Sequence, residues 1–251
     1  MVFSTLNPMN EKKRNPNSKT APHSAESLLE YFKEDFWPNH GTKVIVILFL
    51  LAIGVFSISQ KLKSSAEEED AMAEELGKGL DYIYAGKGDS ALAAFENAIQ
   101  NRTLRGLPLA KAALLAGNLY LQNSNLDSAE ALYKQAIHNA SGIEMLASAA
   151  QHGLAVVAME RQNYSEAIVL LNEFVNKYGK RTGDLAKRYA KTEPVDKVPT
   201  VPDALWKLTL CYLETGDIAK TRQTAEKLLK IYGDSPKAAD ASKLLATLVE
   251  K

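Results

Sequence analysis

The chain has 251 residues and carries 30 basic and 30 acidic side chains. This balance argues against a general nucleic-acid binder, which would show a basic surplus on one face. The single cysteine excludes an internal disulfide, so cysteine usage gives no information about the redox compartment. Aromatic residues make up only 8% of the chain and alanine is abundant, which favours closely packed helices over a β-sandwich. We therefore expect an all-α protein.

Residues 1–43 are predicted to form a cytoplasmic tail. Residues 1–23 are rich in Asn, Pro, Ser and Lys, a composition typical of disorder. Ser24 can cap a short amphipathic helix that Pro38 then ends. Two interpretations of this helix are open: it lies on the membrane surface, or it continues toward the apolar run that follows.

The predicted transmembrane helix comprises residues 44–60, an apolar and uncharged segment. Its 17 residues are at the short end of the length that crosses a bilayer. A buried core helix is less favoured because no comparable apolar partner occurs elsewhere in the chain. A cleaved signal is also less favoured because 43 residues precede the run. Since basic residues are concentrated in the tail, we expect residues 61–251 to lie outside the cytoplasm.

A repeated pattern follows the predicted span. Ala91, Ala129 and Ala167 are 38 residues apart, each near the start of the second helix of a predicted helical hairpin. Gly79 and Gly117 are expected to let the facing helix approach closely, with the aromatic residue one turn on in the same helix filling the gap beside each glycine. The third unit lacks this Gly-x-x-Tyr pair. One hairpin cannot bury its apolar face alone, so we expect the units to stack into a curved solenoid.

The pattern ends with a fourth hairpin and a capping helix. An insertion at about residues 179–201 precedes the fourth unit, and the second helix of the third unit is predicted to extend into it as far as Pro194. The last helix, Pro236 to Val249, has one apolar stripe and one polar face, which is typical of the end of a solenoid.

These hairpins resemble tetratricopeptide repeats over about residues 71–250, because the Gly-x-x-Tyr and Ala-x-x-x-aromatic-x-x-Ala spacings recur. The segment KIYGDSPKAADASKLL is similar to repeats of bacterial envelope proteins, although Gly233 stands where those repeats have proline. An aromatic amphipathic stretch, one span and then repeats resemble the family of single-span inner-membrane proteins that accompany the SecYEG translocon. This resemblance implies a periplasmic repeat domain whose partners are the translocon and a periplasmic chaperone.

Nothing in the sequence indicates catalysis or a cofactor. The four histidines form no HExxH or similar pair, so we do not expect a metal site. Cys211 is interpreted as a core thiol. The GKGD segment at residues 86–89 is interpreted as a turn, because it lacks the ending of a phosphate-binding loop. We therefore expect no enzymatic activity.

What remains is a surface. In the tetratricopeptide repeats that these hairpins resemble, the first helix of each hairpin lines a concave face, and here that face would be largely apolar. The alternative is that the same residues pack against each other or against the capping helix. The expected groove residues are Leu76, Leu80, Ile83, Tyr84, Lys111, Leu114, Asn118, Gln122, His152, Val156, Met159, Trp206, Leu210 and Glu214.

The insertion is basic, with seven basic and three acidic residues between Lys177 and Val201. We interpret it either as a solvated linker or as a contact for lipid headgroups or an acidic partner. Our hypothesis for the whole chain is a membrane-anchored protein-interaction module, a scaffold or co-chaperone near the translocon. The alternative is a structural assembly factor of a cell-envelope or cell-division complex.

Overall fold

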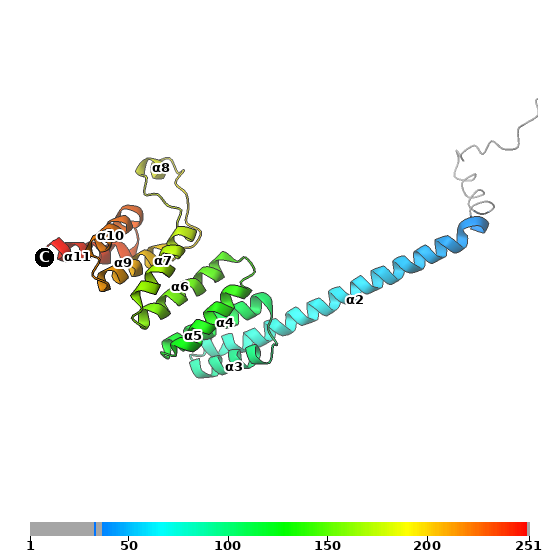
Figure 1. Cartoon of the computed structure of the whole chain (residues 1–251). Helices are drawn as coiled ribbons and strands as arrows, with labels where there is room; N and C mark the ends of the chain where they lie inside the picture. The colour runs from blue at the N-terminus through cyan, green and yellow to red at the C-terminus, as the bar shows by residue number, and fades with distance from the viewer. Residues whose placement is uncertain (1–32, 34–36, 250–251) are drawn as a thin grey trace, which may run out of the picture. The chain divides into compact units, whose positions relative to one another are not determined.

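The all-α architecture is confirmed by a computed structural model, which describes Lys33 and residues 37–249 (Figure 1). The expected amphipathic helix that begins at Ser24 falls on residues that lie, apart from Lys33, outside this described part. The chain divides into two compact units, residues 1–65 and 66–251. The helices are α2 (Trp37–Tyr84), α3 (Gly88–Gln100), α4 (Gly106–Gln122), α5 (Leu126–Asn139), α6 (Glu144–Glu160), α7 (Tyr164–Tyr178), α8 (Leu185–Tyr189), α9 (Val201–Glu214), α10 (Ile218–Tyr232) and α11 (Pro236–Val249).

Helix α2 contains the whole predicted span and continues beyond it without interruption. It has 48 residues, and Pro38 lies in its first turn, where proline is tolerated. Among the described residues, α2 is the one helix long and apolar enough to cross a bilayer, judged by length and composition. Only 6% of its apolar window is buried, and Phe49 is 65% exposed. This exposure does not fit the alternative of a core helix, whose apolar residues would be buried.

The second unit is a stack of helical hairpins. Each helix packs against the next along the chain: α4 on α5, α5 on α6, α6 on α7, α7 on α9, α9 on α10 and α10 on α11. Helix α8 lies in the insertion between α7 and α9 and takes no part in this stack. Three clusters of buried side chains follow one another through the unit, so the hydrophobic core is continuous along the stack rather than central.

Every hairpin turns through the same backbone geometry. The second residue after the end of the first helix has a positive φ in each case: 69° at Gly86, 59° at Ser124, 59° at Gln162 and 74° at Gly216. The next residue donates its N–H to the carbonyl five residues earlier, at 2.8 to 2.9 Å. This left-handed cap satisfies carbonyl groups that the end of a helix leaves free. The first helix of each hairpin therefore stops at the same place in the repeat.

Side-chain caps begin the second helix in three of the four hairpins. Asn125, Asn163 and Asp217 each accept the backbone N–H of the residue three positions on, at 3.0 to 3.3 Å. The first hairpin has Lys87 at this position and no side-chain cap. Consecutive caps, one closing a helix and one opening the next, keep each turn short and bring the two helices together.

The close contact predicted at the repeated glycines is present. A Cβ at Gly79 would overlap the ring of Phe95, and a Cβ at Gly117 would lie 2.9 Å from Cε1 of Tyr133. The predicted origin of the aromatic ring was wrong: it comes from the second helix of the hairpin. The residue one turn on in the first helix, such as Tyr82, is instead 40% exposed. The reason is directional, because the space that a glycine leaves opens toward the facing helix.

A third glycine, Gly153, completes the contact around Tyr133. A Cβ at Gly153 on α6 would lie 2.5 Å from Cζ of Tyr133, so this fully buried ring is held between glycines of two successive hairpins. The sequence pattern missed Gly153 because it aligns Ala155, not Gly153, with Gly117. Gly153 belongs to a contact between hairpins, and a pattern defined within one hairpin contains no information about it.

The C-terminal helix α11 closes the stack as predicted. Ala238 and Ala241 are 4% and 0% exposed, while Lys243 is exposed to solvent. The prediction that the second helix of the third unit extends toward Pro194 was wrong, because α7 ends at Tyr178 and the insertion has its own short helix.

Two neighbouring glycines of α2 test the packing of the first hairpin. Gly79→Ala should lower the free energy of unfolding of residues 66–251 by about 1–3 kcal/mol, because its Cβ overlaps the Phe95 ring. Gly77→Ala is the matched control, since a Cβ there meets nothing within 4 Å. Alanine should leave stability unchanged at Gly77 or raise it by up to about 1 kcal/mol. Urea unfolding followed by far-UV circular dichroism measures both, and equal effects would contradict the assigned contact.

Candidate peptide-binding groove

Three of the expected groove residues meet at a cavity beside the first turn. The cavity has a volume of about 340 Å³ and lies between the end of α2, the start of α3 and the second half of α4. Its lining combines apolar side chains with two amides and the glycines of the turn. The lining residues are Ile83, Gly86, Gly88, Leu115, Asn118, Leu119 and Gln122.

A buried tyrosine orients the amide of Asn118 in this cavity. The hydroxyl of Tyr133 donates a hydrogen bond to Oδ1 of Asn118 at 2.8 Å. Burial raises the pKa of Tyr133 to about 12, so the phenol keeps its proton at neutral pH. Because Oδ1 is the acceptor, the Nδ2 group of Asn118 has two N–H donors left, and neither has a hydrogen-bond partner among the described residues. Asn118 is exposed, so these donors are available to a ligand.

Other expected groove residues are part of the hydrophobic packing. Leu76 is 8% exposed and belongs to the core of the first two hairpins. Leu80 and Leu114 are partly buried against the first and second of the successive cores, and Met159 and Trp206 against the last. For these five residues the self-packing alternative describes what the structure shows, although four of them keep part of their surface exposed.

The rest of the expected set divides by exposure. Tyr84 is 85% exposed and packs against no core. The exposed residues of the set are Tyr84, Lys111, Asn118, Gln122 and Glu214, and the half-buried ones not yet placed are His152, Val156 and Leu210. The face formed by α2, α4, α6 and α9 is therefore polar at several exposed positions rather than uniformly apolar.

His152 joins the third hairpin to the fourth. Its Nε2 lies 2.9 Å from Oδ2 of Asp203, and Nζ of Lys207 lies 2.7 Å from the same oxygen. The ring also packs edge-on against Phe174, with 5.9 Å between ring centroids. Contact with His152, together with the Lys207 ammonium, holds the pKa of Asp203 well below its usual range, although burial opposes this. His152 thus acts as a packed polar residue within the stack.

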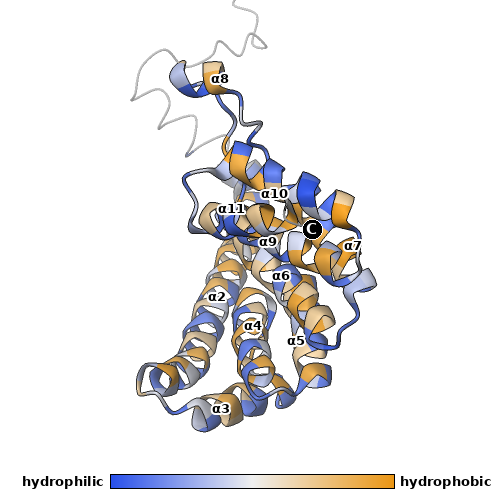
Figure 2. Cartoon of the chain, turned by 90° about the vertical axis from the view of Figure 1, so that its left-hand side faces the viewer, coloured by the Kyte–Doolittle hydropathy of each residue, from blue (hydrophilic) through white to orange (hydrophobic). Residues whose placement is uncertain are grey.

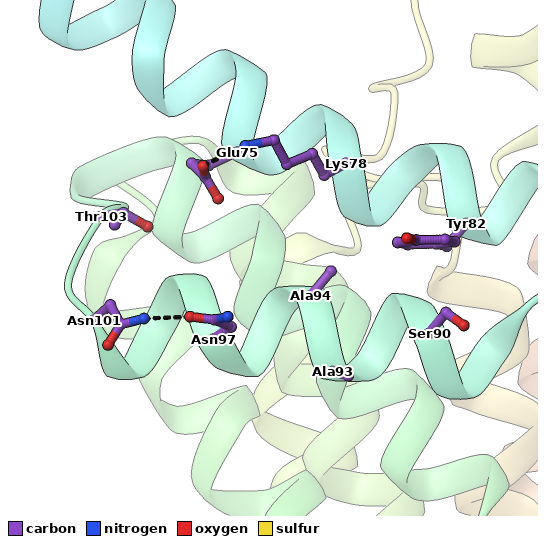
Figure 3. A pocket seen from close by; sticks show the side chains of 9 residues that line it. All are labelled: Glu75, Lys78, Tyr82, Ser90, Ala93, Ala94, Asn97, Asn101 and Thr103. Atoms are coloured by element: carbon purple, nitrogen blue, oxygen red, sulfur yellow. Dashed lines mark hydrogen bonds and ion pairs between the residues drawn. The ribbon is translucent and has the colours of Figure 1, made fainter.

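A second and larger cavity, of about 660 Å³, lies between α2 and α3 (Figure 3). Small side chains line its floor on α3, and Figure 3 shows an ion pair and an amide–amide hydrogen bond at its margin. The lining residues are Glu75, Lys78, Tyr82, Ser90, Ala93, Ala94, Asn97, Asn101 and Thr103.

This second cavity marks the outer end of the hairpin stack. One repeat later, the positions of Glu75 and Lys78 are occupied by Ala113 and Ala116, which are fully buried. The first hairpin therefore carries a charged pair on the face that the second hairpin buries in the stack. A polar outer face is what the terminal unit of a solenoid requires for solubility. We accordingly place the candidate site at the cavity beside Asn118.

The described residues contain no group of three or more His, Cys, Asp or Glu side chains that could hold a metal ion. Cys211 is fully buried, and desolvation raises the pKa of its thiol to about 11. A buried, protonated thiol is a poor nucleophile. The side chains that line the candidate site can form hydrogen bonds and apolar contacts with a ligand.

Comparison with protein families finds matches along most of the second unit. One model of the tetratricopeptide repeat matches residues 76–142 and 114–179, and another matches residues 203–235. Together the matched segments cover more than half of the chain. The unmatched segment between them contains the insertion. No curated protein matches the chain.

Solved structures show the same fold. A tetratricopeptide repeat protein from Parabacteroides merdae is 16% identical, with a TM-score of 0.55 over 72% of this chain and 61% of that protein. The chain thus spans less than two thirds of that protein. The repeats of a kinesin light chain from Podosopora anserina, described as putative, are 19% identical, with a TM-score of 0.51 over 71% of this chain and 85% of theirs. At these identities the likeness concerns the fold alone.

The buried thiol provides a test of the core of the last hairpins. Cys211 in the native protein should react at a negligible rate with a thiol reagent such as Ellman's reagent near pH 8, since it is fully buried and its pKa is raised. In urea one thiol per chain should react at the rate of a free cysteine. Rapid reaction of the native protein would contradict the packing of α9.

Proposed function

The chain belongs to the tetratricopeptide-repeat family and is a protein–protein interaction module, and we propose that it binds extended peptide segments of its partners while anchored to a membrane by α2. The candidate site is the cavity of about 340 Å³ beside Asn118. The single observation that carries this proposal is the pair of N–H donors on Asn118, oriented by Tyr133 and left without a partner in the described residues.

An extended peptide fits the chemistry of this cavity. Its backbone presents a carbonyl acceptor at every residue, and a fixed amide can bind such an acceptor whatever the peptide's side chains are. Ile83 and Leu119 line the same cavity and supply apolar contact for one side chain. Recognition of backbone and one apolar side chain favours clients of varied sequence over a single exact motif.

Anchoring would strengthen weak binding of this kind. The apolar stretch of α2 is exposed along its length, and apolar surface of that extent is unfavourable in water. A bilayer would cover it, and α2 satisfies its own backbone hydrogen bonds, as a lipid-exposed segment must. Holding the groove near its clients raises their effective concentration without any new contact.

The finer part of the proposal is a role as scaffold or co-chaperone beside the protein translocon, with the repeat domain in the periplasm. Its support is the order of parts in the sequence: a tail, one span and then repeats. Crosslinking in intact membranes followed by mass spectrometry tests it. Recovery of translocon subunits with several unrelated clients would support the co-chaperone role. One stoichiometric partner from another envelope complex would instead indicate an assembly factor.

Alanine substitution of two exposed asparagines tests the proposed peptide-binding cavity. Asn118→Ala should weaken binding of a fluorescent, unstructured Leu/Val-rich peptide by about 1 kcal/mol, the net contribution of one hydrogen bond. Trp206→Ala, at the α9 end of the expected groove, should also weaken binding of this peptide. Asn97→Ala is the matched control, because Asn97 is an exposed asparagine in the cavity at the outer end of the stack.

Fluorescence anisotropy gives the affinities, and circular dichroism confirms that each variant is folded. The proposal for this cavity would be overturned if Asn118→Ala and Asn97→Ala bound the peptide as tightly as the unchanged protein.

The orientation of the anchor has its own test. A reporter enzyme that is active only outside the cytoplasm, fused after Lys251, should be active, because the basic residues of the tail favour an N-inside arrangement. The same reporter fused before Met1 should be silent. The opposite pair of results would invert the topology, and activity of neither fusion would argue against an exported domain.

A further inference from the structure

The insertion forms an ordered projection rather than an unstructured linker (Figure 2). Its helix α8 has only five residues but is capped at both ends. Asp184 accepts the N–H groups of Ala186 and Lys187 at 2.9 and 3.3 Å. At the other end Lys191 adopts a positive φ of 55°, and the N–H of Thr192 returns to the carbonyl of Lys187 at 2.8 Å.

Arg188 and Glu193 fasten this projection to α10. Nε of Arg188 donates to Oε2 of Glu193 at 2.6 Å, and its Nη2 donates to the carbonyl of Ile231. The N–H of Gly183 donates to Oε1 of Glu193 at 2.6 Å. Against the effect of desolvation, the hydrogen bonds that Glu193 accepts from Arg188 and from the N–H groups of Gly183 and Thr182 lower its pKa to about 2. Glu193 therefore stays ionised and holds the base of the projection at any physiological pH.

All three acidic residues of the insertion are engaged in such internal contacts. Asp184 caps α8, Glu193 binds Arg188, and Asp196 accepts the N–H groups of Lys180 and Arg181 at 2.6 and 2.9 Å. Their charges are directed at the backbone and at one arginine. They do not offset the lysines at the outside of the projection.

The basic residues divide into an engaged and a free set. The engaged side chains contact acidic or aromatic partners: Lys177 on Tyr178, Arg181 on Asp234 and Tyr232, Arg188 on Glu193, and Lys197 on Glu144. The free set is Lys180, Lys187 and Lys191. These three are exposed, and within residues 37–249 none of their ammonium groups has an acidic side chain within 4 Å.

Two large exposed apolar side chains lie on α8, the helix that also carries Lys187. Leu185 is 63% exposed and Tyr189 is 87% exposed, and they lie one turn apart on α8, so they share a face. Neither belongs to a core cluster, and Figure 2 shows α8 projecting past the ends of the neighbouring helices. The tip of the projection, its α8 end, thus exposes an apolar pair, Leu185 and Tyr189, and carries the unpaired lysines Lys187 and Lys191 on the same short segment.

We propose that this tip binds the surface of an anionic phospholipid bilayer. Leucine can enter the edge of the acyl region, a tyrosine ring is suited to the headgroup level, and lysines attract lipid phosphates. A bilayer accepts a projecting tip without a complementary pocket, whereas a protein partner would need one. The proposal rests on the membrane association proposed for α2, and it applies equally to the bilayer that holds α2 and to a second bilayer.

The experiment uses the full chain in nanodiscs of phosphatidylcholine, with a dye on Ala190→Cys beside the tip. The native thiol of Cys211 is buried and stays unlabelled. Sedimenting vesicles of phosphatidylcholine, with or without phosphatidylglycerol, test binding to a second bilayer. Discs that contain phosphatidylglycerol and a lipid-borne quencher test contact with the bilayer that holds the chain.

We expect sedimentation or quenching only with phosphatidylglycerol, and less of it at high salt. Lys187→Glu with Lys191→Glu should weaken binding at least tenfold, because each lysine near an anionic surface contributes roughly a factor of five. Leu185→Ser with Tyr189→Ser should abolish quenching. The matched control is Lys227→Glu with Lys243→Glu, two exposed lysines on α10 and α11, which should change neither signal.

Disc-bound protein that shows no phosphatidylglycerol-dependent signal in either arm would overturn the inference and leave the anchor standing. Equal losses in the tip and control variants would overturn it as well, since the effect would then be one of net charge. Binding of a Glu-rich peptide without vesicle binding would assign the tip to an acidic protein. A chain that fails to enter discs would overturn the anchor and this inference together. Asn118→Ala should leave lipid binding intact, which separates this test from that of the groove.

Discussion

The contact between a small residue and an aromatic ring is the constraint on which the repeat domain depends. Gly117 and Gly153 leave room for Tyr133 from two sides, and this one ring joins the second hairpin to the third. Its hydroxyl then reaches Asn118 on the exposed face. A single buried side chain therefore couples helix packing within a hairpin, stacking between hairpins and the orientation of the proposed peptide-binding amide.

Each end of the stack has one face that no neighbouring hairpin covers, and the two ends differ in how that face is made compatible with solvent. A solenoid unit has two faces to cover, and a terminal unit has no neighbour on one side. At the start, Glu75 and Lys78 replace the buried alanines of the next repeat and make the open face polar. At the other end α11 covers α10 with a stripe that includes Ala238 and Ala241.

The insertion shows how internal polar contacts can prepare a surface. Its carboxylates bind backbone N–H groups and one arginine, which orders a five-residue helix that could not be stable alone. The same contacts leave the nearby lysines without acidic partners. Order at the base and exposed apolar and basic side chains at the tip are thus two results of one hydrogen-bond network, and net charge alone could not have distinguished this arrangement from a solvated linker.

The sequence by itself determined the helical class, the number and order of the hairpins, the close-contact role of Gly79 and Gly117, and the capping helix, because these follow from local periodicity and from a 38-residue spacing. Only the tertiary structure decided that Phe95 and Tyr133 fill the gaps beside those glycines, and that Gly153 joins them. It also placed Leu76 in the core while it exposed Asn118, and it paired His152 with Asp203. Each of these depends on the side of a helix that a neighbouring hairpin covers. Which side is covered depends on how segments distant in the sequence pack together, and the residue pattern within one repeat does not specify this packing.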